Sequence, residues 1–268
     1  MGVTAFIGGG NMATALIGGL RRGGLDGRSI VVIEPEASQR ARLAREFGVQ
    51  VLAAADTALR TAERVVWAVK PQAFRDAAGP VAPHAAAALH VSVMAGIPSA
   101  AMAHALGTER IVRAMPNTPA LIGQGIAGLY ARPAVDAAGR AAGEAVLAAT
   151  GRVIWVDEEA DLDAVTALSG SGPAYVFYVA EAMVRAATDM GLDPAVGREL
   201  VLATFSGAAA LAQGSPEPLE VLRARVTSKG GTTHAAVSEL DARAVRDAFV
   251  AAVRAAQARA KELGDAFG

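Results

Sequence analysis

The stretch VTAFIGGGNMATALIGGL, at residues 3–20, constrains the fold more than any other part of the sequence. A short apolar run meets three glycines and then continues as a helical pattern. The spacing of Gly8, Gly10 and Ala13 is typical of a strand-to-helix turn that binds the phosphates of a dinucleotide. Gly8 permits the tight turn, Gly10 lets a pyrophosphate approach the backbone, and Ala13 lets the helix lie close to the strand. Free N–H groups at the helix start would then face the phosphates.

The second predicted strand ends in an acidic residue at the position expected for a ribose contact. Glu34 lies 34 − 10 = 24 residues beyond Gly10, close to the usual offset of about 20. A carboxylate there binds the ribose hydroxyls of NADH and repels the 2′-phosphate of NADPH, whereas Arg40 and Arg42 can offset that repulsion. The sequence therefore indicates that NADH can be used, without excluding NADPH. The alternatives are a glycine turn without a ligand and, at Glu34, a solvated acid before Pro35.

Short apolar strand patterns occupy the first half of the chain, with helical patterns between the early ones. We expect strands at residues 3–8, 29–34, 49–52, 64–69, 89–94, 110–115, 125–130 and 152–156, and helices at 11–22 and 38–47. This alternation predicts an α/β fold with a Rossmann-type, mostly parallel sheet and helices on both faces. Strands without polar alternation, such as VVWAV, fit a sheet that is covered on both sides.

After residue 157 the pattern is helical throughout. We expect helices at residues 162–168, 174–190, 194–212, 217–226, 233–239 and 242–263. Gly191, Gly214 and Gly264 are expected at helix ends in the left-handed conformation. The sequence thus predicts two domains, a dinucleotide-binding domain at residues 1–157 and an all-α domain at residues 158–268.

Composition narrows the classes of function. The net charge is −1 and no basic stripe occurs, which argues against nucleic acid as a partner. The absence of cysteine excludes a disulfide framework, a thiolate nucleophile and a cysteine-ligated metal, and no metal site is expected. Neither a signal peptide nor a long uncharged apolar span is recognised, so we expect a cytoplasmic protein without a membrane partner.

Four further motifs accompany the glycine turn, namely AVKP at 68–71, MPNTP at 115–119, LSGSGPAYVF at 168–177 and VTSKGGTT at 226–233. Together with IGGGNMA, and in this order, they resemble the pyrroline-5-carboxylate reductase family. The resemblance implies hydride transfer from NADPH or NADH to the C=N carbon of 1-pyrroline-5-carboxylate, which gives L-proline in the final step of proline biosynthesis. It also implies that the helical domain forms a homodimer, with a pentamer of dimers as a larger assembly.

The expected cofactor contacts all lie in the first domain. The glycine turn and the resemblance together assign them to Ile7, Gly8, Gly9, Gly10, Asn11, Met12, Glu34, Ala68, Val69, Lys70, Pro71, Val93, Met94, Ala95 and Asn117. For Lys70 the alternative is a solvated charge at a strand end. For residues 93–95 it is ordinary buried strand, and for Asn117 a structural turn between two prolines.

The substrate contacts are expected around a second glycine-led helix start in TSKGGTT. Backbone N–H groups of Gly230, Gly231 and Thr232 can hold the single carboxylate of the substrate. The resemblance makes Thr233 the catalytic residue, with its hydroxyl near the ring nitrogen. The full set of expected substrate contacts is Glu159, Ser171, Gly230, Gly231, Thr232 and Thr233. The alternatives are a capping pair of threonines without a ligand and, at Glu159, a solvated acid at a helix start.

Histidine is the side chain most often used as a general acid, but none is assigned that role here. His234 follows Thr233 directly, yet an iminium substrate arrives protonated or takes its proton from solvent. Catalysis is then mainly alignment of the imine carbon with the nicotinamide. His84, His90 and His104 lie in alanine-rich segments and are expected to be structural.

Two departures from the family and two competing functions stay open at this stage. Lys229 stands where many relatives have proline, and Arg225 stands where relatives carry an amide or similar polar residue. One competing function is that of the 3-hydroxyacid dehydrogenases, which use a lysine on a helix of the second domain. Here that domain has only Lys229, in a loop, and Lys261, near the end. The other is a non-catalytic dinucleotide-binding scaffold, which would have no need of SKGGTT.

Overall fold

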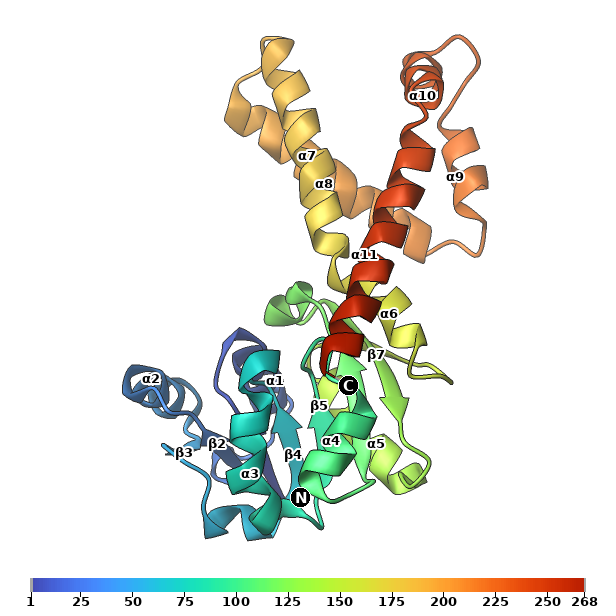
Figure 1. Ribbon diagram of the computed structural model, residues 1–268. Coiled ribbons are helices and arrows are strands. Elements are labelled where there is room, and N and C mark those ends of the chain that lie inside the picture. The colour runs from blue at the N-terminus through green and yellow to red at the C-terminus, as the bar shows by residue number, and fades with distance from the viewer. Residues whose placement is uncertain (1, 268) are drawn as a thin grey trace. The chain divides into compact units, whose positions relative to one another are not determined.

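The computed structural model describes residues 2–267 and has the predicted α/β organisation (Figure 1). The strands are β1 (Val3–Ile7), β2 (Ile30–Ile33), β3 (Gln50–Leu52), β4 (Ala62–Trp67), β5 (Leu89–Ser92), β6 (Ile111–Met115), β7 (Gly125–Ala131) and β8 (Gly151–Trp155). They form one sheet in the order β3-β2-β1-β4-β5-β6-β7-β8. The pairing of β6 with β7 is antiparallel and the other pairings are parallel. The predicted Rossmann-type, mostly parallel sheet is therefore confirmed.

The strand order fixes where a ligand can bind. The chain winds outward from β1 through β2 to β3, and then returns to place β4 on the other side of β1. Ligands of open α/β sheets bind outside the carboxyl ends of the strands at such a reversal. Ile7 and Trp67, the last residues of β1 and β4, are register partners, so the two loops that follow them start side by side.

Two apolar cores cover the two faces of this sheet. Helices α1 (Asn11–Arg22), α2 (Ala37–Phe47) and α5 (Ala137–Ala148) contribute to one core, and α3 (Phe74–Ala85) and α4 (Ser99–Leu106) to the other. Successive residues of β1 point to opposite faces: Phe6 belongs to the first core, and Ala5 and Ile7 belong to the second. This explains why the strands are continuously apolar rather than alternating.

The contacts divide the chain into two compact units at a different place from the predicted boundary after residue 157. The sheet unit comprises residues 2–171 and 256–267, and the helical unit comprises residues 172–255. The short helix α6 (Asp161–Val165) stays with the sheet because it packs directly on β7. A Cβ atom on Gly128 would lie only 2.8 Å from Val165. A glycine at this point of the strand therefore admits the helix.

The helical unit contains α7 (Gly172–Asp189), α8 (Pro194–Gln213), α9 (Leu219–Arg225), α10 (Thr232–Ala242) and the start of α11 (Val245–Phe267). Gly191 ends α7 with φ +89°, as predicted. Gly214 ends α8 as predicted, but with φ −82° rather than in the left-handed conformation. The prediction for Gly264 was wrong, since it lies inside α11. The last helix continues past Gly264 because Phe267 packs against the core that α3 and α4 share with the sheet.

Helices α7 and α8 leave most of their apolar side chains uncovered. The buried residues on these two helices are Ala180, Ala187, Gly197 and Val201. Within residues 2–267, α8 alone is long and apolar enough to cross a membrane, with a mean hydropathy of 1.3 over its best window and 11% of that window buried. Length and composition are weak evidence for a span, since helices that pack on other protein meet the same criteria.

Candidate functional site

The glycine turn after β1 has the backbone geometry that a dinucleotide site requires. Gly8 has φ +92°, and a Cβ atom there would lie 2.8 Å from the carbonyl oxygen of Ala68. Gly10 is exposed, and a Cβ atom there would meet no heavy atom within 4 Å. Gly10 is also the N-cap of α1, and no side chain caps this helix. The first N–H groups of α1 therefore face open space, as an incoming pyrophosphate requires.

Glu34 lies against this turn, as the spacing predicted. Its Oε2 accepts a hydrogen bond from the Gly9 N–H at 2.8 Å, and its Oε1 accepts one from the Glu36 N–H at 2.9 Å. The carboxylate thus stands between the ends of β1 and β2, where the adenosine ribose of a bound dinucleotide lies.

The two arginines that were expected to offset the Glu34 charge have other partners. Arg40 donates to the main-chain oxygens of Glu34 and Pro35, at 2.8 and 2.6 Å. Arg42 donates to the Thr14 hydroxyl at 3.0 Å. These neutral acceptors leave both guanidinium groups charged, and Arg40 is held at the main chain of Glu34 itself.

The loop after β4 adjoins the glycine turn. The Ala68 N–H donates to the Ile7 carbonyl at 2.8 Å, which extends the pairing of β4 with β1 by one residue. Ala68 and Val69 are half-buried, while Lys70 is exposed and caps the short 3₁₀ helix η3 (Pro71–Ala73). The structure thus brings this loop to Gly8 and leaves both readings of Lys70 open.

The loop after β5 begins one strand further along the same edge of the sheet. The Val93 N–H donates to the Trp67 carbonyl at 3.0 Å, and the Met94 N–H donates to the Ser92 hydroxyl at 3.2 Å. Met94 is buried, whereas Ala95 is exposed. The three expected nicotinamide contacts therefore lie on a loop that is anchored to the sheet at its first residue.

Asn117 has a role in the fold itself. It is buried, and its side-chain oxygen accepts a hydrogen bond from the Ile126 N–H at 3.0 Å. This bond ties the turn η4 (Thr118–Ile122) to the start of β7. The alternative of a structural turn therefore has direct support, and contact of Asn117 with the cofactor stays a prediction.

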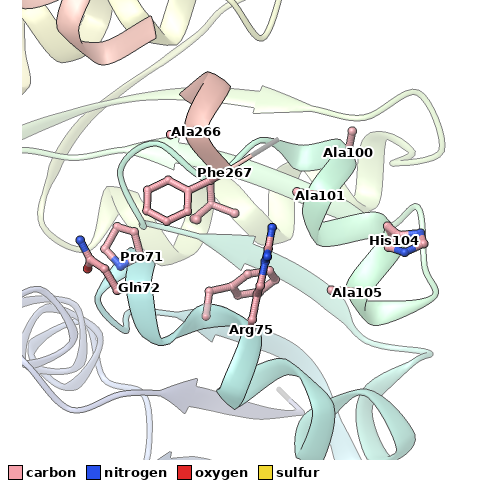
Figure 2. Close-up of a pocket in the computed structure, with 11 residues that line it drawn as sticks. Pro71, Gln72, Arg75, Ala100, Ala101, His104, Ala105, Ala266 and Phe267 are labelled. Carbon is pink, nitrogen blue, oxygen red and sulfur yellow. The ribbon is translucent and has the colours of Figure 1, made fainter. Parts of the chain in front are cut away.

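A hollow of about 850 Å³ lies in the sheet unit beside the loop after β4 (Figure 2). It is lined by Pro71, Gln72, Phe74, Arg75, Ile97, Ala100, Ala101, His104, Ala105, Ala266 and Phe267. Of the predicted site residues, Pro71 is the one that borders it. Figure 2 shows the Phe267 ring next to Pro71, so the last turn of α11 forms one wall of the hollow.

Glu159 is not a free acid. Its Oε1 accepts hydrogen bonds from the Ser99 N–H at 2.7 Å and from Arg113 Nη1 at 2.9 Å, and its Oε2 accepts one from the Ser99 hydroxyl. Neither of the two readings of the sequence, a substrate contact or a solvated acid, anticipated this arrangement. One signal was available, because Arg113 interrupts the apolar strand IVRAM and a buried guanidinium needs a partner.

Ser171 ends a π-helical turn, η5 (Thr166–Gly170), and its N–H donates to the Thr166 carbonyl at 2.8 Å. Single turns of π-helix are frequent at functional sites. Glu159 and Ser171 belong to the sheet unit, whereas the other four expected substrate contacts belong to the helical unit.

The second glycine-led helix start forms as predicted, with one difference. Gly230 has φ +76°, Gly231 is the N-cap of α10, and no side chain caps this helix. The Gly231 N–H donates to the Ser228 carbonyl at 3.0 Å, so the prediction that it holds the carboxylate is not supported. The N–H groups of Thr232 and Thr233, in the first turn of α10, can take that role.

The residues around this turn are placed as follows. Thr233 is half-buried, and His234 is exposed next to it. Lys229 is exposed in the turn. Arg225 forms an ion pair with Glu217, so its side chain is directed along α9. The first turn of α10 therefore offers N–H groups that no side chain caps, with the Thr233 hydroxyl on the same turn, an arrangement suited to an anion.

His90 is structural, as expected. It is fully buried, its Nδ1 accepts a hydrogen bond from Trp67 Nε1 at 2.9 Å, and its Nε2 lies 3.0 Å from the Ala85 carbonyl. The neutral tautomer with the proton on Nε2 satisfies both contacts. Burial lowers the pKa of His90 to about 4, so the ring stays neutral near pH 7.

Comparison with known proteins agrees with this geometry in both units. A family model described as pyrroline-5-carboxylate reductase dimerisation matches residues 159–263, and one described as NADP oxidoreductase, coenzyme F420-dependent, matches residues 3–96. A pyrroline-5-carboxylate reductase from Pseudomonas aeruginosa is 45% identical over 267 residues, which cover 98% of this chain and 97% of that protein.

Solved structures give the same result. A pyrroline-5-carboxylate reductase from Coxiella burnetii has a TM-score of 0.91 and 36% identity, and the match covers 98% of each chain. The pyrroline carboxylate reductase from Plasmodium falciparum, solved with NADP bound, has a TM-score of 0.87 and 25% identity, again over 98% of each chain. On the strength of full-length identity and shared fold, the chain belongs to the pyrroline-5-carboxylate reductase family.

Proposed function

We infer that this chain reduces 1-pyrroline-5-carboxylate to L-proline, with NADPH or NADH as the hydride donor. The observation that carries the inference is the open, uncapped start of α1 at Gly10, beside the reversal of strand order between β1 and β4. A dinucleotide fits there because Gly10 has no neighbour to exclude it and the helix start offers N–H groups. The solved Plasmodium relative, with NADP bound, supports the same assignment.

Residues of four loops, those that follow β1, β2, β4 and β5, would hold the cofactor. The turn at Gly8, Gly9 and Gly10 would hold the pyrophosphate, Glu34 the adenosine ribose, and the loops at 68–71 and 93–95 the nicotinamide half. When bound, the reduced nicotinamide supplies the hydride that the imine carbon accepts. The protein's own contribution is to hold the nicotinamide ring in one orientation.

The helical unit would hold the substrate. The first turn of α10 offers N–H groups of Thr232 and Thr233 to the carboxylate, and the Thr233 hydroxyl lies on the same turn. We propose that this hydroxyl binds the ring nitrogen and so sets the direction from which the hydride arrives. The nitrogen of the imine carries its proton on arrival or takes it from solvent, and His234 has no assigned part. Ser171 is retained as a substrate contact.

The reaction is tested by supplying the purified protein with pyrroline-5-carboxylate and NADPH. We expect oxidation of the cofactor and formation of L-proline in equal amounts. A protein that binds NADPH but gives no proline would instead support the non-catalytic scaffold.

The choice of cofactor is the finer part of the proposal. Because the Glu34 carboxylate is bonded to the glycine turn, where it can reach the ribose hydroxyls, NADH should be usable as well as NADPH. Substituting Glu34→Ser removes the charge that repels a 2′-phosphate. The ratio of kcat/KM for NADPH to that for NADH should then rise about tenfold. An unchanged ratio would mean that Glu34 is not the ribose ligand.

The assembly is proposed from the exposed helices. Residues 159–263 match the dimerisation model of the family, and α7 and α8 carry exposed apolar faces. We propose a homodimer through the helical unit, with a pentamer of dimers as the larger assembly, in the cytoplasm. On this proposal the apolar side chains along α8 pack against a second chain and not against lipid.

A further inference from the structure

The loop at residues 93–98, between β5 and α4, is held at its far end by a carboxylate from a distant part of the chain. Helix α4 starts at Ser99 with Pro98 as its N-cap, and no residue next to it in sequence supplies a side-chain cap. Instead, the Ser99 N–H and hydroxyl both donate to Glu159, which lies 60 residues further along. A carboxylate at a helix start also interacts favourably with the helix dipole.

The same carboxylate is fixed by a buried cation on the neighbouring strand. Arg113 Nη1 lies 2.9 Å from Glu159 Oε1, and the Arg113 side chain is 10% exposed. Arg113 is the register partner of Ser92, whose hydroxyl accepts the Met94 N–H at the start of the loop. The loop is therefore anchored at its start by Ser92 and at its end, through Glu159, by Arg113. Ser92 and Arg113 lie side by side on the neighbouring strands β5 and β6.

A third group completes the arrangement at Ser99. Arg132 Nη1 donates to the Ser99 hydroxyl at 3.2 Å, and Arg132 also pairs with Glu109. Both oxygens of Glu159 are thus engaged by protein donors. Three of the roughly four acceptor positions of the Glu159 carboxylate are taken, and turning it towards a substrate would weaken its pairing with the largely buried Arg113 guanidinium, which is costly.

We propose that Glu159 is a positioning residue for the nicotinamide-binding loop and is not a substrate ligand. Through Ser99 it fixes the end of the loop that carries Val93, Met94 and Ala95. The affinity for the dinucleotide then depends on a residue that does not touch it. The proposal rests on the proposed function only in assigning the nicotinamide half to this loop.

The test compares Glu159→Gln, Ser99→Ala and Glu158→Gln in the full-length protein. Glu159→Gln keeps the shape of the side chain and removes its charge. Ser99→Ala removes the hydroxyl that donates to Glu159 and accepts from Arg132. Glu158→Gln is the matched control at an exposed neighbouring acid. Three quantities are measured: amide hydrogen exchange of the unliganded protein, the Kd for NADPH by calorimetry, and the Kd for proline at saturating NADPH. The first two need no substrate, so they do not depend on which imine the enzyme reduces.

We expect Glu159→Gln to raise the Kd for NADPH about tenfold and Ser99→Ala about threefold, because a loosened loop must be ordered on binding. Amide hydrogen exchange at residues 93–102 should be faster in both variants than in the wild type. The Kd for proline should stay within about twofold of wild type once the cofactor is saturating, and Glu158→Gln should change nothing beyond about twofold.

Two results would overturn the proposal. In the first, Glu159→Gln weakens proline binding while the Kd for NADPH is unchanged, which would make Glu159 a substrate ligand. In the second, both affinities and the exchange at residues 93–102 match wild type. If Glu159→Gln does not fold because Arg113 loses its partner, Ser99→Ala decides alone, since it leaves the ion pair in place.

Discussion

The two units of this protein differ in where their apolar side chains go. In the sheet unit, large side chains such as Phe6, Leu16 and Trp67 are fully buried. In the helical unit, Phe177 is 59% exposed and Leu200 is 55% exposed. The sheet unit therefore has its own two-sided core, whereas the helices leave an apolar face exposed, which fits the match of residues 159–263 to a dimerisation model. Leaving large apolar side chains such as these in contact with water has a free-energy cost.

The largest expected effect is loss of the proposed dimer when the exposed apolar faces of α7 and α8 are charged. Replacing both Phe177 and Leu200 by aspartate puts charge on α7 and α8, where we expect contact between chains. The dimer should be weakened by about 4 kcal/mol or more, roughly 1,000-fold in its dissociation constant. Light scattering should report the mass of a monomer. The matched control replaces the exposed Leu121 and Ile122 of the sheet unit by aspartate and should remain a dimer. If both double variants kept the wild-type mass, the helical faces would not be the interface.

The next effect is a pH dependence of stability that arises from the buried core of the sheet unit. His90 has its pKa lowered by burial to about 4, whereas an unfolded chain binds that proton near pH 6.5. The stabilisation from the neutral ring is therefore full above pH 6.5 and is lost as the pH falls towards 4. The loss amounts to about 3 kcal/mol in the free energy of unfolding.

Urea titrations of the wild type and of His90→Gln at several pH values measure this term. Glutamine offers an oxygen and an amide group without titrating in this range. The difference in unfolding free energy between the two proteins should shrink as the pH falls from 6.5 to 4. A difference that is constant with pH would mean that His90 is not the group that titrates.

The smallest effect concerns one hydroxyl of the helical unit. Thr233→Ala leaves the N–H groups of α10 in place and removes one hydrogen bond to the substrate. We expect transition-state stabilisation to weaken by about 1–3 kcal/mol, which lowers kcat/KM roughly ten- to a hundredfold. His234→Ala, at the exposed next residue, should have little effect. If Thr233→Ala were kinetically silent while His234→Ala abolished turnover, the turn would be a proton donor and not an anion seat.

Local features of the fold and the site could be predicted from the sequence. The turn at Gly8 and Gly10 depends on residues that are adjacent in the chain, and Glu34 lies at a spacing that one βαβ unit fixes. The helix start after Gly230 could also be predicted, because two adjacent glycines precede the helical pattern at residues 233–239.

Features that depend on distant partners could not be predicted. The pairing of Glu159 with Arg113 joins residues 46 apart in sequence, and nothing near Glu159 identifies its partner. The bond from the Gly231 N–H to Ser228 depends on how the turn closes. The end of α11 was placed too early because the packing of Phe267 against the sheet unit outweighs the low helix propensity of Gly264.

We expect the sheet unit to bind the dinucleotide and the helical unit to bind the substrate carboxylate. Calorimetric titration of NADPH and proline into Gly10→Val and Gly231→Val tests this division. A Cβ atom at Gly10 would meet no heavy atom within 4 Å, whereas one at Gly231 would lie 2.7 Å from the Ser228 hydroxyl and 3.2 Å from the Ser228 main-chain oxygen, so the turn before α10 must shift to admit it. Each variant should obstruct its own ligand alone, because the two glycines lie in different units.

We predict that Gly10→Val raises the Kd for NADPH about 100-fold or more, while Gly231→Val leaves it within about twofold. At saturating NADPH, Gly231→Val should weaken proline binding about 100-fold. The claim would be contradicted if Gly231→Val lost NADPH as severely as Gly10→Val does, or if proline bound to it with wild-type affinity.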